Sequence, residues 1–143
     1  MIIILKKGAT EADAAQGVLA ALDGADAILL APSNPYLSIG PVLAVAAIRD
    51  TIERRRVRCV GVSPLVGGAA VTGPLARMLT RMAGGASPTV VAGCYTDLID
   101  ALVIDESDAP AEAEVELIVT NTLMRDRDAE RRLAEFVLGA ACA

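Results

Sequence analysis

The chain has 143 residues, close to the commonest size of a single domain, and 54% of them are hydrophobic but only 2% aromatic, so one core of aliphatic side chains is expected. Thirteen Lys and Arg against 18 Asp and Glu give a net charge of −5, which argues against nucleic acid as a partner because a phosphate backbone would be repelled on average. The absence of histidine excludes Ser-His and Cys-His catalytic triads and His-ligated zinc within this chain.

Short apolar runs alternate with helical patterns along the chain. The runs expected to form strands are residues 2–5, 27–31, 57–62, 101–104 and 115–119. Helices are expected at residues 11–22, 41–55, 74–82, 89–99 and 126–141, with a short helical turn at 109–113. Repeated β-α-β units predict an α/β fold: a mostly parallel sheet with helices on both faces, in a Rossmann-like three-layer architecture, as one domain over residues 1–143.

The loop that follows the second expected strand is rich in proline and small polar residues. In open α/β sheets such loops gather at the carboxyl ends of the strands, where ligands bind. Gly40 allows close approach of a backbone, and the helix that follows offers unpaired N–H groups. Ser33, Asn34, Ser38 and Gly40 are therefore candidate phosphate ligands. The alternative is an ordinary turn in which the Ser and Asn side chains only cap backbone groups.

A second candidate loop follows the third expected strand. Its paired glycines Gly67 and Gly68 can let backbone N–H groups form an anion-binding nest, and Thr72 and Gly73 precede the next helix. The alternative is that the glycine pair only turns the chain. Two such loops on successive strands favour phosphate binding, although no catalytic residue is indicated.

Two carboxylates, Asp105 and Asp108, follow the fourth expected strand at the same edge of the sheet. Carboxylates there can hold Mg²⁺, which takes one or two protein oxygens and leaves the other positions to water and phosphate. The alternative is that Ser107 or Asp108 starts and caps a short helical turn.

No segment of the chain has the pattern of a membrane span or a signal peptide. The longest apolar stretch, residues 39–48, is far shorter than the roughly 20 residues that a bilayer requires. Lys6 and Lys7 follow the first apolar run, whereas a signal peptide has its basic residues first. We therefore expect a cytoplasmic protein without a membrane partner.

Five sequence blocks occur in the order of a known family pattern. Residues 33–41 read S-N-P-x-x-S-I-G-P, residues 59–68 are an expected strand followed by S-P-x-x-G-G, and residues 71–74 end in G-P. Residues 95–108 read Y-x-D-x-x-D…V-I-D…D, and residues 120–124 read T-N-T-L-M. Together they span most of residues 17–138 and resemble the 2-phospho-L-lactate transferase family of coenzyme F-420 biosynthesis. One departure is Asn121, which stands where the family pattern has Asp. If that position serves metal or acid-base chemistry, Asn121 keeps the shape and loses the function.

The resemblance implies a transferase that moves a phospholactyl-type group from a guanosine-diphosphate-activated donor to a hydroxyl of the deazaflavin Fo, with Mg²⁺ and release of GMP. Phosphoryl transfer depends mainly on positioning and charge neutralisation, so a site without histidine is compatible with it. In this interpretation Ser33, Asn34, Ser38, Gly67 and Gly68 contact the donor phosphates.

Members of that family are about twice as long, and their amino-terminal half supplies a glycine-rich nucleotide loop and acidic residues that this sequence lacks. The chain is therefore interpreted as the carboxy-terminal half, incomplete as a lone enzyme: a natural short form, a truncated product, or a subunit that joins a separate amino-terminal half or forms a homo-oligomer. Two alternatives stay open. One is a non-catalytic regulatory module that binds a nucleotide or nucleotide sugar, and the other is a purely structural subunit of a split enzyme.

Overall fold

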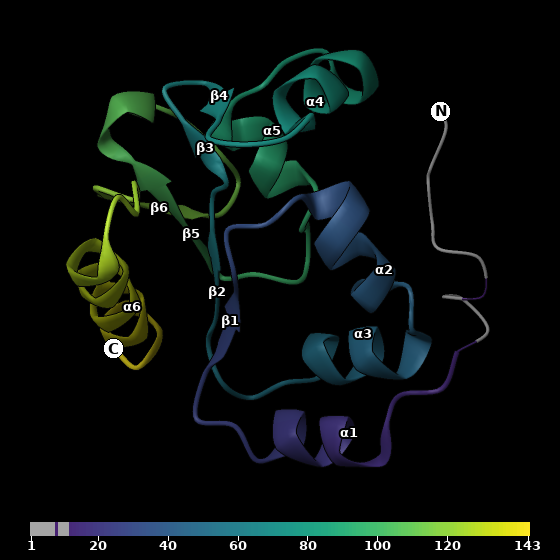
Figure 1. Ribbon diagram of the computed structural model, residues 1–143. Helices are drawn as coiled ribbons and strands as arrows, with labels where there is room; N and C mark the ends of the chain where they lie inside the picture. The colour runs from purple at the N-terminus through teal and green to yellow at the C-terminus, as the bar shows by residue number, and fades with distance from the viewer. Residues whose placement is uncertain (1–7, 9–11) are drawn as a thin grey trace.

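The computed structural model describes residues 8 and 12–143, so the strand expected at residues 2–5 lies outside the described part. Its main sheet has four parallel strands in the order β1-β2-β5-β6 (Figure 1). Their bounds are β1 Ile28–Leu30, β2 Cys59–Val62, β5 Ala101–Asp105 and β6 Glu116–Thr120. The spatial order equals the chain order, so each later strand is added on the same side of its predecessor.

Helices cover both faces of this sheet, which confirms the predicted three-layer α/β architecture (Figure 1). One face packs against α2 (Gly40–Leu43), α3 (Ala46–Glu53), α4 (Leu75–Ala83) and α5 (Pro88–Gly93). The other face packs against α6 (Arg127–Ala141), and α1 (Gln16–Asp23) lies against α3. Within the described ranges, no helix combines the length and hydrophobicity needed to cross a bilayer.

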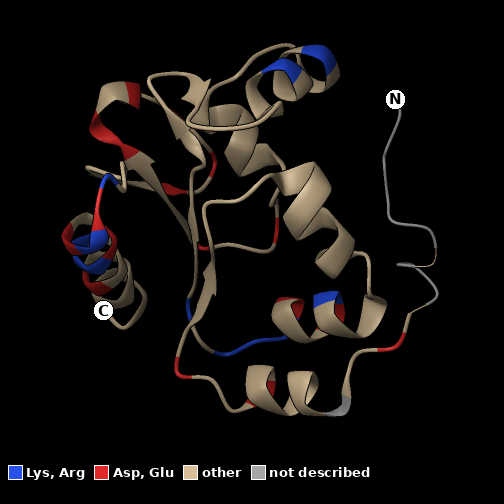
Figure 2. Ribbon diagram, in the orientation of Figure 1, with Lys and Arg blue, Asp and Glu red and all other residues tan. Residues whose placement is uncertain are grey.

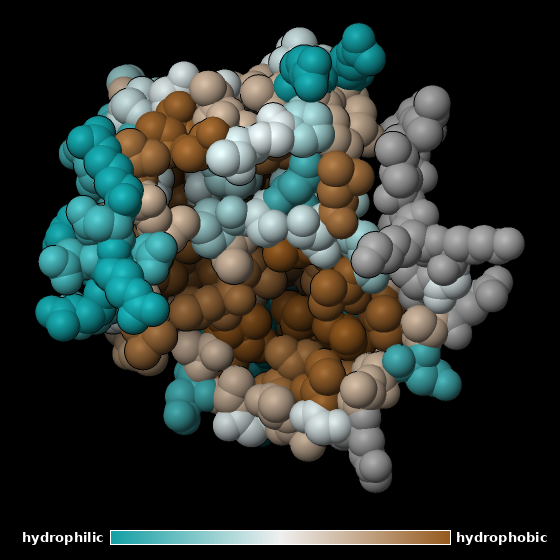
Figure 3. All heavy atoms as spheres, in the orientation of Figure 1, coloured by the Kyte–Doolittle hydropathy of each residue, from teal (hydrophilic) through white to brown (hydrophobic). Residues whose placement is uncertain are grey.

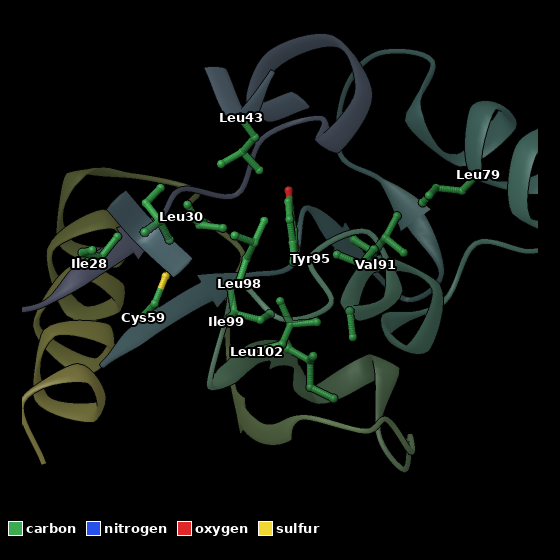
Figure 4. Packing of buried hydrophobic residues seen from close by; sticks show 14 of the residues in the cluster. Ile28, Leu30, Leu43, Cys59, Leu79, Val91, Tyr95, Leu98, Ile99 and Leu102 are labelled. Carbon is green, nitrogen blue, oxygen red and sulfur yellow. The ribbon is translucent and has the colours of Figure 1, made fainter. Parts of the chain in front are cut away.

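The larger core lies between the sheet and helices α2 to α5. Tyr95, Leu98 and Leu102 are at most 2% exposed and lie at its centre (Figure 4). Burying one such leucine stabilises the fold by about 2–3 kcal/mol. On β2, Gly61 leaves room for this packing, since a Cβ there would lie 3.2 Å from Cδ1 of Leu102.

Helix α6 closes the opposite face, and its sequence shows why it forms where it was expected. The carboxylate of Asp126 accepts a hydrogen bond from the Ala129 N–H at 2.8 Å, which caps the helix. Leu133 and Val137 are buried one helical turn apart, against Val60 of β2.

Three predicted segments differ in the structure. The helix expected at 41–55 is interrupted at Val45, whose ψ of 106° is extended, and the helix expected at 89–99 ends at Gly93. The short helical turn lies at Glu106–Asp108 (η3) and not at 109–113. No proline or glycine marks the interruption at Val45, so the residue pattern could not indicate it.

The predicted glycine loop is a β-hairpin. Strands β3 (Leu65–Val66) and β4 (Ala69–Ala70) pair antiparallel, and only two residues join them. Gly67 and Gly68 have φ values of 60° and 71°, so both central positions are left-handed, as a type I′ turn requires. Glycine adopts this conformation without the cost of a Cβ.

Candidate functional site

A cleft of about 410 Å³ opens at the carboxyl edge of the sheet. Three loops and the approach to α4 form its walls: residues 32–34, 37 and 38 after β1, 63 and 64 after β2, 66 and 70–75 from the hairpin to α4, and 122–124 after β6. Parallel strands bring these loops together although they lie up to about ninety residues apart in the sequence. The predicted candidates Ser33, Asn34, Ser38, Thr72 and Gly73 all line this cleft.

Asn34 holds the first loop in shape. Its Oδ1 accepts hydrogen bonds from the N–H groups of Tyr36 at 2.9 Å and Leu37 at 3.0 Å, which caps the π-helical turn Pro35–Ile39 (η2). Its Nδ2 donates to Sδ of Met78 on α4 at 3.6 Å. The side chain therefore caps backbone groups, as the alternative expected, and a phosphate contact of Asn34 stays a prediction.

Gly40 lies where η2 continues directly into α2. A Cβ at this position would lie 2.7 Å from the carbonyl oxygen of Pro35, too close for any other residue without a backbone shift. The wide turn arises because Ser38 and Ile39 both donate backbone hydrogen bonds to the carbonyl of Asn34, at 2.9 and 3.1 Å. Gly40 does not line the cleft, so its observed contribution is to the shape of the loop.

Three residues that line the cleft carry hydroxyl groups without a hydrogen-bond partner among the described residues. The hydroxyls of Ser33, Ser38 and Thr72 make no hydrogen bond to any described residue. Helix α4 begins after Pro74, which has no side chain that can cap it, so the first N–H groups of α4 lack a side-chain acceptor. Gly73, with φ 79°, turns the chain into this helix.

The cleft is also uncharged. None of its lining residues is Asp, Glu, Lys or Arg, and the loop between β1 and α2 is entirely tan in Figure 2. Its polar groups are hydroxyls, amides and backbone N–H groups. A cleft of this composition can bind an anion through hydrogen bonds and a helix N-terminus, without a counter-charge from its own walls.

Gly67 and Gly68 lie outside the cleft lining. The N–H of Gly68 donates to Oδ1 of Asp108 at 2.5 Å, so a carboxylate of the chain itself takes the place that was expected for a phosphate. This contact ties the hairpin to η3. Phosphate binding by the glycine pair stays a prediction, and it would require Asp108 to move.

Asp105, the last residue of β5, is only 3% exposed. Its Oδ1 accepts hydrogen bonds from the backbone N–H and the hydroxyl of Ser107. Its Oδ2 accepts from the N–H of Thr122 at 2.8 Å and from the Thr122 hydroxyl at 3.2 Å. Burial alone would raise the pKa of Asp105, but the hydrogen bonds from Ser107 and Thr122 outweigh burial and lower it. Because Thr122 lines the cleft, Asp105 positions one of its walls.

The contacts of Asp105 and Asp108 do not fit the expected magnesium site. All four hydrogen bonds to Asp105 come from its own chain and occupy both of its oxygens. Asp108 keeps one buried oxygen, Oδ2, without a partner, but a single carboxylate oxygen outside the cleft lining is not a site. Across residues 12–143, no group of three or more His, Cys, Asp or Glu could hold a metal ion. Magnesium binding stays a prediction.

The cleft wall formed by Thr122 to Met124 was not among the site residues predicted from the sequence. Two features of the sequence could have indicated it: its position directly after an expected strand, and its place in the T-N-T-L-M block of the family resemblance. Asn121 next to it is exposed and does not line the cleft. Its Nδ2 donates to Oε1 of Glu106 at 3.2 Å, an acceptor that would repel an Asp at this position.

Comparison with known proteins gives one consistent family. Residues 3–135 match the family described as "2-phospho-L-lactate transferase CofD". Three curated relatives bear the name 2-phospho-L-lactate transferase. The protein of Methanosarcina acetivorans is 36% identical over 93% of this chain and 44% of its own length. The protein of Methanothermobacter thermautotrophicus is 37% identical over 87% of this chain and 42% of its own length. The protein of Methanococcoides burtonii is 31% identical over 96% of this chain and 46% of its own length. The chain thus spans somewhat less than half the length of these relatives.

Proposed function

The chain belongs to the 2-phospho-L-lactate transferase family, and from this premise we propose that its cleft holds the diphosphate of a guanosine-diphosphate-activated donor while a phospholactyl-type group passes to a deazaflavin hydroxyl. Because the chain spans less than half of its relatives, the complete reaction is proposed for the complete protein, with this chain supplying the donor-phosphate part of the site. Its expected cytoplasmic location stays a prediction.

One observation carries this proposal: unused hydroxyl and backbone N–H donors from separate loops converge on one uncharged cleft at the carboxyl edge of a parallel sheet. Ser33 and Ser38 belong to one wall, and Thr72 with the start of α4 belongs to another. Helix N-termini and hydroxyl groups bind phosphate oxygens through hydrogen bonds and the positive end of the helix dipole.

In the proposed reaction, the acceptor hydroxyl oxygen forms a bond to the donor phosphorus that carries the lactyl group. The bond between that phosphorus and the oxygen bridging the two phosphates breaks, and GMP leaves with the electron pair. The proton of the hydroxyl passes to solvent. Since no ionisable side chain lines the cleft, the lining contributes positioning of the donor, and a group that assists proton transfer would come from outside the cleft lining. Magnesium and the deazaflavin enter the proposal through the family, and we assign no contact to them.

The test is a transfer assay with the phospholactyl-diphosphoguanosine donor, the deazaflavin and Mg²⁺. The chain would be assayed alone and together with the part of the Methanosarcina acetivorans relative that it does not match. We expect phospholactyl-deazaflavin and GMP in equal amounts from the combination, measured by mass spectrometry, and loss of both when Ser33 and Ser38 are replaced by Ala. Product formation that is insensitive to these two replacements would contradict the assigned site.

A regulatory module that binds a nucleotide without turning it over is the second candidate. The uncharged lining of the cleft favours it, because binding needs only the observed donors whereas transfer needs groups from elsewhere. This function would be selected over the transferase if the chain bound GDP saturably, both alone and together with the unmatched part of the relative, and neither preparation formed GMP from the donor.

A further inference from the structure

Helix α4 carries two arginines beside the cleft. A second hollow, of about 320 Å³, is lined by residues at the i, i+3, i+4 and i+7 positions of one helix face: Pro74, Arg77, Met78 and Arg81. Pro74 also lines the cleft. Met78 accepts the hydrogen bond from Nδ2 of Asn34, which belongs to the cleft wall after β1. The hollow and the cleft are therefore neighbours along one face of α4.

Both arginines of this face are open to a ligand. Arg77 and Arg81 are exposed, and neither forms an ion pair or a hydrogen bond with a described residue. Arg49 on α3 and Arg131 on α6, in contrast, each pair with the Glu four residues later. Figure 2 shows blue and no red on α4, and Figure 3 shows strongly hydrophilic side chains projecting from the surface over this helix.

The sequence around α4 contains no carboxylate, although the net charge of the chain is −5. Residues 54–96, which include the hairpin, α4 and α5, hold six arginines and no Asp or Glu. Residues 27–49, which include the first cleft wall, also lack Asp and Glu. An exposed arginine on a helix is usually only solvated. A pair of them on one helix face, next to an uncharged cleft, instead places positive potential at one end of that cleft.

The uncharged cleft alone does not fix the direction in which a diphosphate lies. Hydroxyl and backbone N–H donors can bind the oxygens of either phosphate. The proposed donor has two unlike ends, a neutral guanosine and a lactyl group that carries a carboxylate. Guanidinium groups attract a carboxylate through their charge and bind it through paired hydrogen bonds. Arginines at one end of the cleft therefore distinguish the two directions.

We propose that Arg77 and Arg81 form an anion subsite that binds the carboxylate of the phospholactyl group and turns the nucleoside of the donor away from α4. This assignment rests on the proposed function, because it takes the donor from there, and it adds the residues that select the transferred group. A group with a carboxylate next to its phosphate binds more tightly than a neutral alkyl group of similar size.

The test measures, by calorimetry, how tightly the chain binds two probes: the guanosine-diphosphate-activated phospholactyl donor, and its ethyl analogue, in which hydrogen replaces the carboxylate. We expect the wild type to prefer the donor by about threefold to thirtyfold, the effect of two exposed charge contacts. The preference should decrease as salt is added, because both arginines are exposed. Arg77→Gln combined with Arg81→Gln should abolish it, and Gln preserves the helix propensity.

Arg127→Gln combined with Arg131→Gln is the matched control. These two arginines are also exposed and four residues apart, but they lie on α6, which covers the opposite face of the sheet. The control removes the same charge and should keep the preference for the donor. A preference that falls equally in both double variants would be an effect of net charge and would overturn the assignment.

Equal affinity of the wild type for both probes, or a preference that survives the replacements on α4, would also overturn it. Amide shifts of Ser33 and Ser38 in the ¹⁵N-labelled chain test the proposed function separately. Donor binding that shifts these amides without any carboxylate preference would remove the subsite and keep the proposed function. A preference that depends on Arg77 and Arg81, with unshifted Ser33 and Ser38, would do the reverse. No binding of either probe would contradict both.

Discussion

Asp105 is predicted to stabilise the fold through its ionised carboxylate, and Asp105→Asn tests this with almost no change in size. The amide keeps one acceptor but turns an NH₂ group toward either Ser107 or Thr122, each of which offers a backbone N–H and a hydroxyl. In either orientation one backbone N–H loses its acceptor at a side chain that is only 3% exposed. An unsatisfied buried donor and the loss of a hydrogen bond to a charged group each cost about 1–3 kcal/mol, so we expect a loss of about 2–3 kcal/mol in the free energy of unfolding.

The pH dependence gives a second readout of the same contact. The pKa of Asp105 is lowered in the folded state, so its contribution is fully present above the unfolded pKa of about 3.9 and is lost as the pH falls through the folded value. The stability gap between the wild type and Asp105→Asn should therefore be constant near neutral pH and shrink in acid.

Urea unfolding followed by circular dichroism at several pH values measures both effects. Asp50→Asn is the control, because Asp50 is exposed on α3 and accepts no side-chain hydrogen bond from a described residue. Two results would refute the reasoning. One is a difference in the free energy of unfolding below about 0.5 kcal/mol at neutral pH, which is within the range of ordinary surface substitutions. The other is a difference that does not change in acid.

Further predictions concern the loop, the core and the cleft. Gly40→Ala should destabilise the fold by about 1–3 kcal/mol, because its Cβ would lie 2.7 Å from a carbonyl oxygen; wild-type stability in urea would contradict this. Leu98→Ala should cost about 2–5 kcal/mol, since Leu98 is fully buried, and a loss below 1 kcal/mol would mean that the core is packed differently there. Replacing both Ser33 and Ser38 by Ala should weaken GDP binding by about 10-fold to 100-fold with an unchanged circular-dichroism spectrum, because each hydroxyl offers one unused donor to a charged phosphate; equal affinity would remove both residues from the site.

The sheet could be predicted because each of its strands contains a short, mainly apolar run. Strand β5 shows this, since residues 101–104 are uniformly apolar and lie buried between helices on both faces. The hairpin of β3 and β4 was missed because each strand has only two residues. A two-residue Gly-Gly connection between short apolar pairs is nevertheless a hairpin signal, and it explains Gly67 and Gly68 better than an open loop does.

The loops of the cleft could be predicted from their positions after strands, but the contacts and roles of individual side chains could not be predicted. Asp105 looks the same in sequence whether it binds a metal or its own chain; the deciding partner, Thr122, lies 17 residues away. The same applies to Asp108, whose contact with Gly68 spans 40 residues. Long-range contacts of this kind depend on how strands align in the sheet, which local patterns do not encode.

The most direct test of the central claim, that the cleft at the carboxyl edge binds the donor diphosphate, is a titration of the ¹⁵N-labelled chain with GDP, with and without Mg²⁺, followed by NMR. The predicted result is saturable one-site binding with shifts concentrated on Ser33, Ser38, Thr72, Gly73 and the first residues of α4. The contradicting result is no saturable binding, or shifts that lie on other surfaces and leave these amides unchanged.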